Sequence, residues 1–338
     1  MIELIKVIKE NSINCINSIN NINSVNFSTE NHMPSVIVNN ITKQYGKKKD
    51  LVQALKGVSF EVQQGELFGI IGPDGAGKTS LFRILTTLLL PDGGTASVDG
   101  LDVVKDFKAI RHRVGYMPGR FSLYQDLTIE ENLEFFATIF NTTVKDNYDL
   151  IKEIYSQIEP FKNRRAGKLS GGMKQKLALS CALIHKPSVL FLDEPTTGVD
   201  AVSRKEFWEM LRSLKRQGIT ILVSTPYMDE AGMCDRVALM QNGEVLSVDS
   251  PEGVIDAFKQ PLVAVKDNNM LQLLNDLQRY EGVKDAYPFG EYHHVVLNNG
   301  FSASAVQQYL QQHNYHQPEV KTIRADIEDC FIALMKSA

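Results

Sequence analysis

Apolar positions along this chain follow the period of strands in some stretches and the period of helices in others. Residues 36–42 (VIVNNIT) and 58–62 (VSFEV) alternate apolar and polar side chains, which predicts strands with one buried face. Residues 67–71 (LFGII) and 189–192 (VLFL) are continuous apolar runs, typical of strands that are buried on both faces of a parallel sheet. Residues 219–223 (ITILV) predict a further strand.

Stretches with helical periodicity separate these strands. They cover residues 78–88, 127–157, 171–186 and 201–217. Thr128 and Glu131 form a capping box, which marks the start of one helix. Strands that alternate with helices predict an α/β fold, in which helices cover both faces of a mostly parallel sheet. Asn242-Gly243 predicts a β-hairpin that adds antiparallel strands, so we expect a mixed sheet.

The pattern changes after Pro251. Residues 262–324 predict the order strand, helix, strand, strand, helix, strand, which indicates a small C-terminal α+β domain of the ferredoxin-like type. We expect a first domain over residues 33–258 and an accessory domain over residues 261–338. The histidines of this region have irregular spacing, and no Cys or carboxylate cluster joins His293, His294, His313 and His316. We interpret them as surface or strand-face side chains rather than metal ligands.

Residues 1–32 differ in composition from the rest of the chain. Residues 11–26 (NSINCINSINNINSVN) form an uncharged repeat with little apolar area to offset the entropy of ordering. We expect either a disordered leader or a start codon assigned upstream of the true one at Met33. No function is assigned to this segment.

Composition argues against several classes of protein. In 338 residues, 36 Lys and Arg against 40 Asp and Glu give a net charge of −4, which argues against a nucleic-acid partner. The wide spacing of the cysteines excludes a zinc ribbon, a CxxC redox pair and a disulfide scaffold: Cys15, Cys181, Cys234 and Cys330. No run approaches the roughly 18 apolar residues that cross a bilayer. If this protein works at a membrane, something other than a spanning segment of this chain would hold it there.

A glycine-rich loop follows the first continuous apolar run. It fits the pattern G-x-x-x-x-G-K-[ST] with Gly72, Pro73, Asp74, Gly75, Ala76, Gly77, Lys78 and Thr79. Such a loop directs backbone N–H groups and a helix N-terminus toward phosphate oxygens. Lys78 would meet the β- and γ-phosphates, and the Thr79 hydroxyl would bind Mg²⁺. The loop predicts an ATP site that extends to Ser80.

The apolar run over residues 189–192 ends in two carboxylates, Asp193 and Glu194. A buried strand that ends here brings Asp193 beside the phosphate loop, where it can hold Mg²⁺ through water. Glu194, one residue further on, points in a different direction and can polarise an attacking water. We therefore expect Glu194 to be the catalytic residue.

A third motif, residues 169–173 (LSGGM), opens a helix upstream of Asp193. With the phosphate loop, it makes residues 36–258 resemble the ATP-binding cassette of ABC transporters, a P-loop NTPase whose helical subdomain would span about residues 120–165. The resemblance implies that Ser170, Gly171 and Gly172 contact ATP held by a second cassette, as a helix N-terminus can. It also implies that Tyr45 stacks on adenine and that residues 197–200 (TGVD) match the D-loop.

Other segments resemble drug-exporter ATPases of the daunorubicin-resistance and YbhF types. They are residues 115–128 (GYMPGRFSLYQDLT), residues 224–231 (STPYMDEA) and, in the accessory domain, residues 327–332 (IEDCFI). The resemblance implies an ATP- and Mg²⁺-dependent subunit at the cytoplasmic face of the cell membrane. It would pair with a second cassette, in a homodimer or a heterodimer, and drive efflux through separate permease subunits. The helical insertion around residues 120–162 would meet the permease.

Two positions depart from the family's pattern. Gly119 stands where the family usually has a Gln that touches Mg²⁺ and the attacking water, and Pro226 stands where it usually has a His that contacts the γ-phosphate. Neither side chain can form a hydrogen bond. One interpretation is lineage drift with activity retained; the other is a site that binds ATP well and hydrolyses it poorly. Loss of one such group typically costs about 10²–10³ in rate.

Two alternatives to the exporter subunit stay open at this point. One is a catalytically weak regulatory cassette, which turnover of the isolated chain against that of its complex would distinguish. The other is a soluble ABC ATPase that acts on DNA or ribosomes. Such proteins need tandem cassettes, basic linkers or long coiled-coil insertions, which this chain lacks.

Overall fold

The computed structural model describes residues 34–47 and 50–337, and the leader predicted over residues 1–32 lies outside this part. A six-stranded sheet in the order β10-β9-β3-β8-β7-β6 forms the centre of the fold. Its strands are β3 (Leu67–Ile71), β6 (Val114–Met117), β7 (Val189–Asp193), β8 (Thr220–Thr225), β9 (Arg236–Gln241) and β10 (Glu244–Asp249). Neighbouring strands are parallel, except that β10 runs antiparallel to β9. The turn between β9 and β10 is the predicted hairpin, with positive φ at Asn242 and Gly243.

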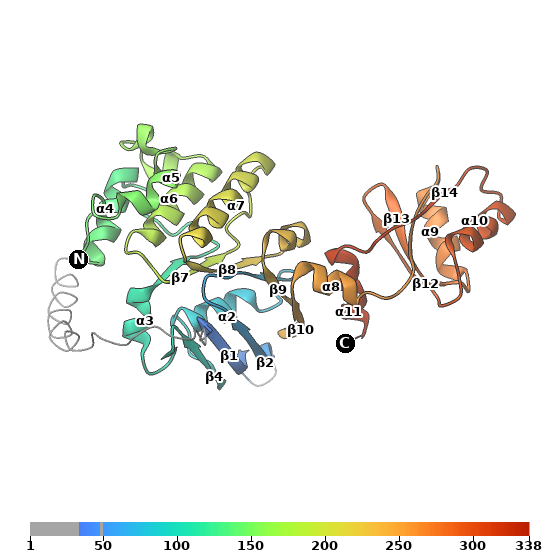
Figure 1. Cartoon of the computed structure of the whole chain (residues 1–338), viewed down its shortest axis with the longest axis horizontal. Helices are drawn as coiled ribbons and strands as arrows, with labels where there is room; N and C mark the ends of the chain where they lie inside the picture. Colours follow the sequence, from blue (N-terminus) through green and yellow to red (C-terminus); the bar gives the residue numbers. More distant parts are fainter. Residues whose placement is uncertain (1–33, 48–49, 338) are drawn as a thin grey trace, which may run out of the picture. The chain divides into compact units, whose positions relative to one another are not determined.

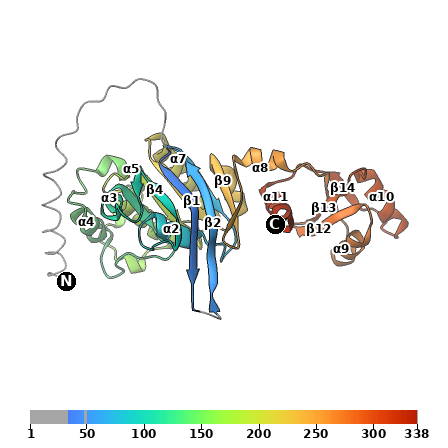
Figure 2. The same ribbon diagram turned by 90° about the horizontal axis from the view of Figure 1, so that it is seen from below.

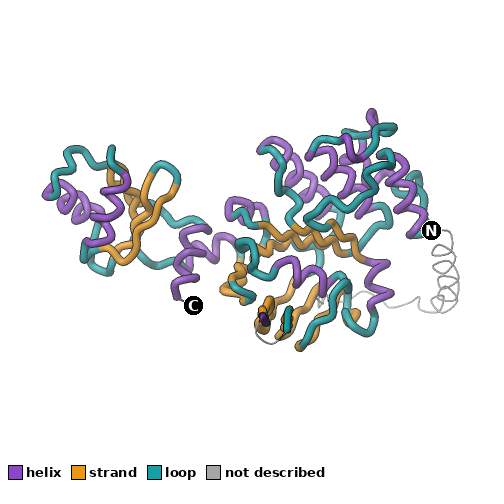
Figure 3. Tube along the Cα trace, turned by 180° about the vertical axis from the view of Figure 1, so that it is seen from behind, coloured by secondary structure: helices purple, strands orange, loops and turns teal. Residues whose placement is uncertain are grey.

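Both faces of this sheet are buried, as the continuous apolar runs predicted. On β3, Leu67 and Ile71 enter one hydrophobic core, while Phe68 and Ile70 enter another on the opposite face. The first core is built with four helices: α4 (Ile129–Ile139), α5 (Tyr148–Tyr155), α6 (Gly171–Leu183) and α7 (Ala201–Arg216). The second is built with α2 (Lys78–Leu85) and a second sheet. Figure 1 and Figure 3 show the six-stranded sheet between these two layers.

The second sheet is antiparallel and has the order β2-β1-β4-β5. It consists of β1 (Val36–Tyr45), β2 (Val52–Val62), β4 (Gly93–Val98) and β5 (Leu101–Asp102), and α3 (Phe107–Arg113) follows it. Strands β1 and β2 form a long pair (Figure 2). The sequence pattern predicted only part of this sheet, because β4 (GGTASV) is rich in glycine and small polar residues.

Several helices end earlier than predicted. Helix α2 stops at Leu85 rather than near residue 88, because Thr87 adopts a left-handed conformation with φ 62°. The stretch 127–157 holds two helices, α4 and α5, with Asn141 at φ 54° between them. The capping box at the start of α4 is confirmed: Thr128 accepts a hydrogen bond from the Glu131 N–H, and Glu131 accepts one from the Thr128 N–H.

The C-terminal region follows α8 (Pro251–Ala257) and contains a separate antiparallel sheet in the order β12-β13-β11-β14. Its elements are β11 (Leu262–Lys266), α9 (Met270–Arg279), β12 (Val283–Phe289), β13 (Tyr292–Leu297), α10 (Ala303–Gln312) and β14 (Glu319–Thr322). The helix α11 (Ile327–Ser337) then returns to the first core, where it packs with α8 and with the 3₁₀ helix η4 (Met228–Met233). No helix in the described part of the chain is long and apolar enough to cross a membrane.

The four histidines of this region divide into two pairs. His293 and His294 are buried on β13, where His293 Nε2 lies 2.7 Å from the Met270 carbonyl and His294 Nδ1 lies 2.7 Å from Asp329. His313 and His316 are exposed. The strand-face interpretation therefore holds for the first pair and the surface interpretation for the second.

Candidate functional site

The phosphate loop joins β3 to α2 at the carboxyl end of the central sheet. Lys78 is almost fully buried, and its Nζ atom donates hydrogen bonds to the carbonyls of Gly72 and Pro73, at 2.7 and 3.0 Å. Gly77 precedes the helix with φ 103°, and a Cβ there would lie 2.4 Å from the Ala54 carbonyl. Only glycine fits this close approach without strain. The loop thus folds around the ammonium group of its own lysine.

Asp193 and Thr79 lie together, as expected of a pair that binds Mg²⁺. The Thr79 hydroxyl donates to Asp193 Oδ1 at 3.2 Å, and the Ser224 hydroxyl donates to the same oxygen at 2.6 Å. Carboxylate and hydroxyl oxygens are ligands that Mg²⁺ prefers. The pairing follows from the sheet order, since β3 and β7 both neighbour β8. Thr79 and Asp193 therefore fit a Mg²⁺ site, and Ser224 is a neighbour that sequence reasoning missed.

Glu194 stands at the end of β7 in an unusual backbone conformation. Its φ is 50°, in the left-handed region, which costs a non-glycine residue about 1–3 kcal/mol. Its N–H donates to the carbonyl and the hydroxyl of Ser224, at 3.0 and 3.1 Å, and these bonds hold the turn. The Glu194 carboxylate is turned toward the phosphate loop, where Oε1 lies 3.4 Å from Lys78 Nζ. It thus faces the region in which a γ-phosphate would sit.

A cavity of about 250 Å³ lies over the phosphate loop. It is lined by Ala54, Gly75, Ala76, Gly77, Lys78, Thr79, Ser80 and Glu194. The Tyr45 hydroxyl lies 3.1 Å from the Ser80 hydroxyl, and 39% of Tyr45 is exposed. Tyr45 therefore stands beside the loop with an accessible ring, as a side chain that stacks on a base must. Ala54 is a lining residue that no sequence motif marked.

The two atypical positions follow strands of the central sheet: Gly119 comes two residues after β6, and Pro226 directly follows β8. A Cβ added to Gly119 would lie 3.0 Å from the Asp193 carbonyl and 3.7 Å from Glu194 Cβ. Pro226 directly follows β8, whose last residue, Thr225, accepts a hydrogen bond through its carbonyl from the Gly72 N–H at 3.2 Å. Both positions therefore adjoin the site, and neither offers it a side-chain hydrogen bond.

The LSGG segment lies away from this cavity, at the N-terminus of α6. Ser170 caps the helix through a hydrogen bond from the Met173 N–H at 3.4 Å. A Cβ on Gly171 would lie 3.5 Å from the Gly198 carbonyl, and one on Gly172 would lie 3.0 Å from the Ser203 hydroxyl. The segment thus packs beside the 197–200 loop, with a helix N-terminus that can bind an anion.

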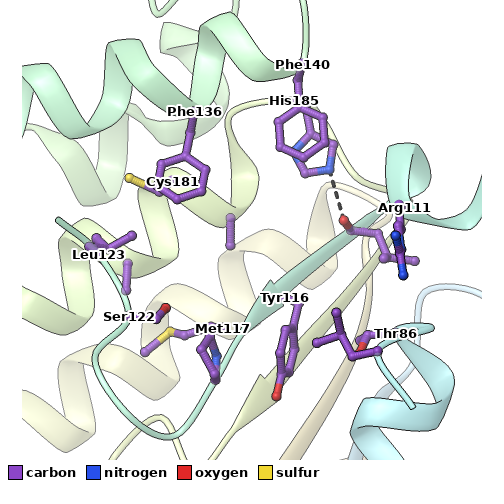
Figure 4. A pocket seen from close by; sticks show the side chains of 15 residues that line it. Thr86, Arg111, Tyr116, Met117, Ser122, Leu123, Phe136, Phe140, Cys181 and His185 are labelled. Carbon is purple, nitrogen blue, oxygen red and sulfur yellow. Dashed lines mark hydrogen bonds between the residues drawn. The ribbon is translucent and has the colours of Figure 1, made fainter. Parts of the chain in front are cut away.

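A second cavity, of about 360 Å³, opens between β6 and helices α4 and α6. Figure 4 shows its largely apolar lining, in which the rings of Phe140 and His185 stack with centroids 3.8 Å apart. His185 Nε2 lies 3.0 Å from the Val114 carbonyl, whereas Nδ1 is buried with no partner in the described structure. Burial lowers the pKa of His185 to about 4, although the bond to Val114 opposes this. Burial, with the negative charge of Asp193, raises the pKa of Tyr116 in the same lining to about 12.

Comparisons of the sequence with known proteins point to one family. The ABC transporter family model matches residues 55–197. The chain is 36% identical over 310 residues to the probable multidrug ABC transporter ATP-binding protein YbhF of Escherichia coli (strain K12). The match covers 90% of this chain and 52% of that protein. The chain thus spans about half the length of this relative. It is 33% identical over 301 residues to the daunorubicin resistance ATP-binding protein DrrA2 of Streptomyces coeruleorubidus, covering 86% of this chain and 92% of that one.

Solved structures give the same result for the fold. The ATP-binding cassette MJ0796, in a dimeric post-hydrolysis state bound to ADP and Pi, superposes with a TM-score of 0.59 at 27% identity, over 64% of this chain and 98% of that one. The cbiO1 protein of Clostridium perfringens, part of the ABC transporter complex cbiONQ, superposes with a TM-score of 0.58 at 26% identity, over 66% and 91% of the two chains.

Proposed function

This chain belongs to the ATP-binding proteins of ABC transporters, and from that premise we propose that it is the ATPase subunit of an exporter that couples MgATP hydrolysis to efflux through separate permeases. One observation carries the proposal: Lys78, Thr79, Asp193 and Glu194 converge beside a single cavity. Together they supply the kinds of group that phosphoryl transfer to water requires. The names of the relatives YbhF and DrrA2 support a role in drug export.

The residues have distinct roles in this proposal. Lys78 and the N–H groups of the phosphate loop bind the β- and γ-phosphates, and Tyr45 supports the base. Bound Mg²⁺ neutralises charge on the phosphate oxygens, and Thr79 and Asp193 are the residues that would hold it. Glu194 orients the attacking water and accepts its proton.

Pairing with a second cassette explains the position of the LSGG segment. Ser170, Gly171 and Gly172 lie outside the lining of the cavity over Lys78. An anion site at the N-terminus of α6 can serve a nucleotide bound by another chain. The dimeric structure of MJ0796 supports such an arrangement. The partner is a second copy of this chain or a different cassette.

We also propose that ATP hydrolysis is weakened at the nucleotide site of this chain. Gly119 and Pro226 adjoin Asp193 and Thr225 and offer no side-chain hydrogen bond. We therefore expect the site on this chain to bind ATP and to hydrolyse it slowly.

We propose that a segment of the permease binds in the second cavity. Its lining is largely apolar, and it contains Leu88, of which 58% is exposed, and the unpartnered His185 Nδ1. Met117 and Pro118 belong to this lining, and Gly119 follows them beside Asp193. A segment inserted here would therefore press on the loop next to the site. This would give a short path between transport and hydrolysis. Held by its permease, the working protein would sit at the cytoplasmic face of the membrane.

The domain division also belongs to the proposal. We assign residues 33–258 to the cassette, with the helical subdomain over about 120–165, and residues 261–338 to an accessory domain. The order βαββαβ, with the antiparallel strand order β12-β13-β11-β14, supports a ferredoxin-like class for the latter. A small hydrophobic core of its own, which includes Val265, Leu277 and Leu310, supports a separate unit.

Co-expression with the permease subunits of an ABC exporter tests this function. The full chain should be recovered with membranes, and Phe136→Glu, in the second cavity, should release it without changing ATP affinity. Phe161→Glu is the control, since Phe161 is a partly exposed ring elsewhere in the helical subdomain. Recovery with ribosomes or DNA, and not with membranes, would contradict an exporter.

A further inference from the structure

Glu230 is a buried carboxylate that the roles assigned above do not use. It lies on η4 with 2% of its surface exposed. Its Oε2 accepts a hydrogen bond from the Thr225 hydroxyl at 2.5 Å, and its Oε1 accepts one from the Thr196 hydroxyl at 2.8 Å. Arg204 Nε donates to the same Oε1 at 3.1 Å. A buried charge is costly unless it is paired and hydrogen-bonded, and Glu230 has both kinds of partner.

The three donors come from three segments that adjoin the site. Thr196 lies two residues after Glu194, in the turn that leads to the 197–200 loop. Thr225 ends β8 directly before Pro226, and its carbonyl accepts the N–H of Gly72 at the start of the phosphate loop. Arg204 lies in the first turn of α7, which follows the 197–200 loop. One carboxylate therefore ties together the segments on either side of the catalytic glutamate.

These contacts also hold the loop after β8, in which Pro226 has neither an N–H nor a polar side chain to form a hydrogen bond. The Thr225 hydroxyl, while donating to Glu230, accepts the N–H of Tyr227 at 3.1 Å. The guanidinium of Arg204 lies 4.5 Å from the centre of the Tyr227 ring and also pairs with Asp229. The loop is thus held by the residues before and after Pro226.

The support extends outward to the C-terminal helix. Ala231, next to Glu230 on η4, belongs to the same hydrophobic core as Cys330 and Phe331 of α11. Thr196 and Thr225 are themselves almost fully buried. The Glu230 carboxylate is therefore surrounded by buried groups, and its hydrogen bonds have little freedom to rearrange.

We propose that Glu230 is a positioning residue for ATP hydrolysis: through Thr196 and Thr225 it fixes the segment that follows Glu194 to the loop that carries Pro226. The inference rests on the proposed hydrolysis at Glu194. Because Glu230 lines no part of the nucleotide cavity, it acts on the placement of Glu194 and not on the binding of ATP. Loss of its hydrogen bonds should lower turnover and leave ATP affinity unchanged.

The test uses the full chain with Thr196→Val and Thr225→Val, which remove one hydroxyl each and keep the shape of the side chain. The rate of hydrolysis is measured per bound nucleotide, so that unfolded protein does not count. We expect each variant to lower kcat about 10-fold, which corresponds to about 1.4 kcal/mol, with less than about a 2-fold change in ATP affinity. Thr196→Ser and Thr225→Ser restore the hydroxyl and should restore kcat.

Thr220→Val is the matched control. Thr220 is a buried threonine at the other end of β8, and its hydroxyl contacts Ser35 and the Gly65 N–H. The Thr220→Val variant should be less stable than the wild type but should keep the wild-type kcat per bound nucleotide. Glu230→Gln is a second test, with an expected fall in kcat larger than that of either Val variant.

The outcomes separate the two proposals. A wild-type chain that binds ATP without hydrolysing it contradicts the hydrolysis proposed for this site, and the positioning role with it. A wild-type chain that hydrolyses ATP, with Val variants that keep its kcat, overturns only the role of Glu230. An equal fall in kcat for Thr220→Val also overturns that role, since it would show a general effect of destabilisation.

Discussion

The ammonium group of Lys78 lies 3.4 Å from the carboxylate of Glu194, with side chains 3% and 24% exposed. Lys78 also donates to the carbonyls of Gly72 and Pro73, so its charge is directed at the loop and at the catalytic candidate. A triphosphate in the cavity would compete with Glu194 for this lysine. Binding of ATP would then free the Glu194 carboxylate to accept a hydrogen bond from water.

The first prediction concerns this lysine. Lys78→Ala removes the charge that meets the β- and γ-phosphates, so ATP affinity should fall by about 10–100-fold or more, as expected for charge-assisted hydrogen bonds of about 1.5–3 kcal/mol. Titration with a fluorescent ATP analogue measures the change. Lys56→Ala is the control, since Lys56 pairs with Glu244 on the surface. Unchanged affinity in Lys78→Ala would exclude the phosphate loop as the ATP site.

The sequence predicted most strands of the central sheet because their burial follows from their own residues, although β6 (Val114–Met117) was not predicted. Strand β3 and the first four residues of β7 are apolar, and the two faces of each strand enter different cores. The short polar strand β4 and the helix α11 were not predicted, since tertiary contacts rather than local pattern decide them. The position of the second cavity had no local signal, because its lining comes from β6, α4 and α6, which are distant in sequence.

The residues of the candidate site also divide into those that the sequence could predict and those that it could not. Residues at fixed spacing, such as Lys78, Thr79 and Asp193, were predictable because a loop or strand end places them. Glu230 was not, because it acts through partners that lie 34 and 26 residues away along the chain, Thr196 and Arg204. Ser224 likewise touches Asp193 only because β7 and β8 are neighbours in the sheet.

The second prediction concerns the atypical positions. Gly119→Gln should restore an amide beside Asp193 and raise kcat, and Pro226→His should add a donor for the γ-phosphate. A Cβ at 119 would lie 3.0 Å from the Asp193 carbonyl, so the loop must shift slightly to accept the side chain. We expect gains of about 10-fold or more, since such groups typically contribute about 10²–10³.

Gly119→Ala and Pro226→Ala are the matched controls for these gains. Gly119→Ala adds a Cβ and Pro226→Ala removes the proline ring, and neither adds a hydrogen-bonding side chain. Steady-state ATPase of the full chain gives the comparison. If neither restored side chain raises kcat above its alanine control, the two positions are lineage drift and the site is not weakened by them.

The third prediction concerns pH. The pKa of His185 is about 4 in the folded protein because the ring is buried, against about 6.5 in the unfolded chain. The unfolded state therefore binds more protons between these values, so the free energy of unfolding should fall as the pH falls from about 6.5 to about 4.

His185→Phe isolates this contribution, because it keeps a ring against Phe140 and removes the titrating group. Urea unfolding of both proteins across this pH interval should give a steeper loss for the wild type. His313→Phe, at an exposed position, should behave as the wild type. Equal slopes for wild type and His185→Phe would show that His185 titrates alike in the folded and unfolded states.

The last prediction concerns the two sites of a cassette pair. If this chain pairs with a cassette that has both Gln and His, the site on Lys78 and Glu194 should hold ATP for long periods. The other site should hydrolyse ATP, using the partner's catalytic groups and the Ser170 end of α6 from this chain.

Ser170→Arg places a long cation where Ser170 caps the helix, so it should obstruct the competent site. Glu194→Gln alters only the slow site. Steady-state ATPase of the reconstituted complex should therefore fall further with Ser170→Arg than with Glu194→Gln. If Glu194→Gln stops turnover while Ser170→Arg leaves it near wild type, this chain is the working catalyst despite Gly119 and Pro226.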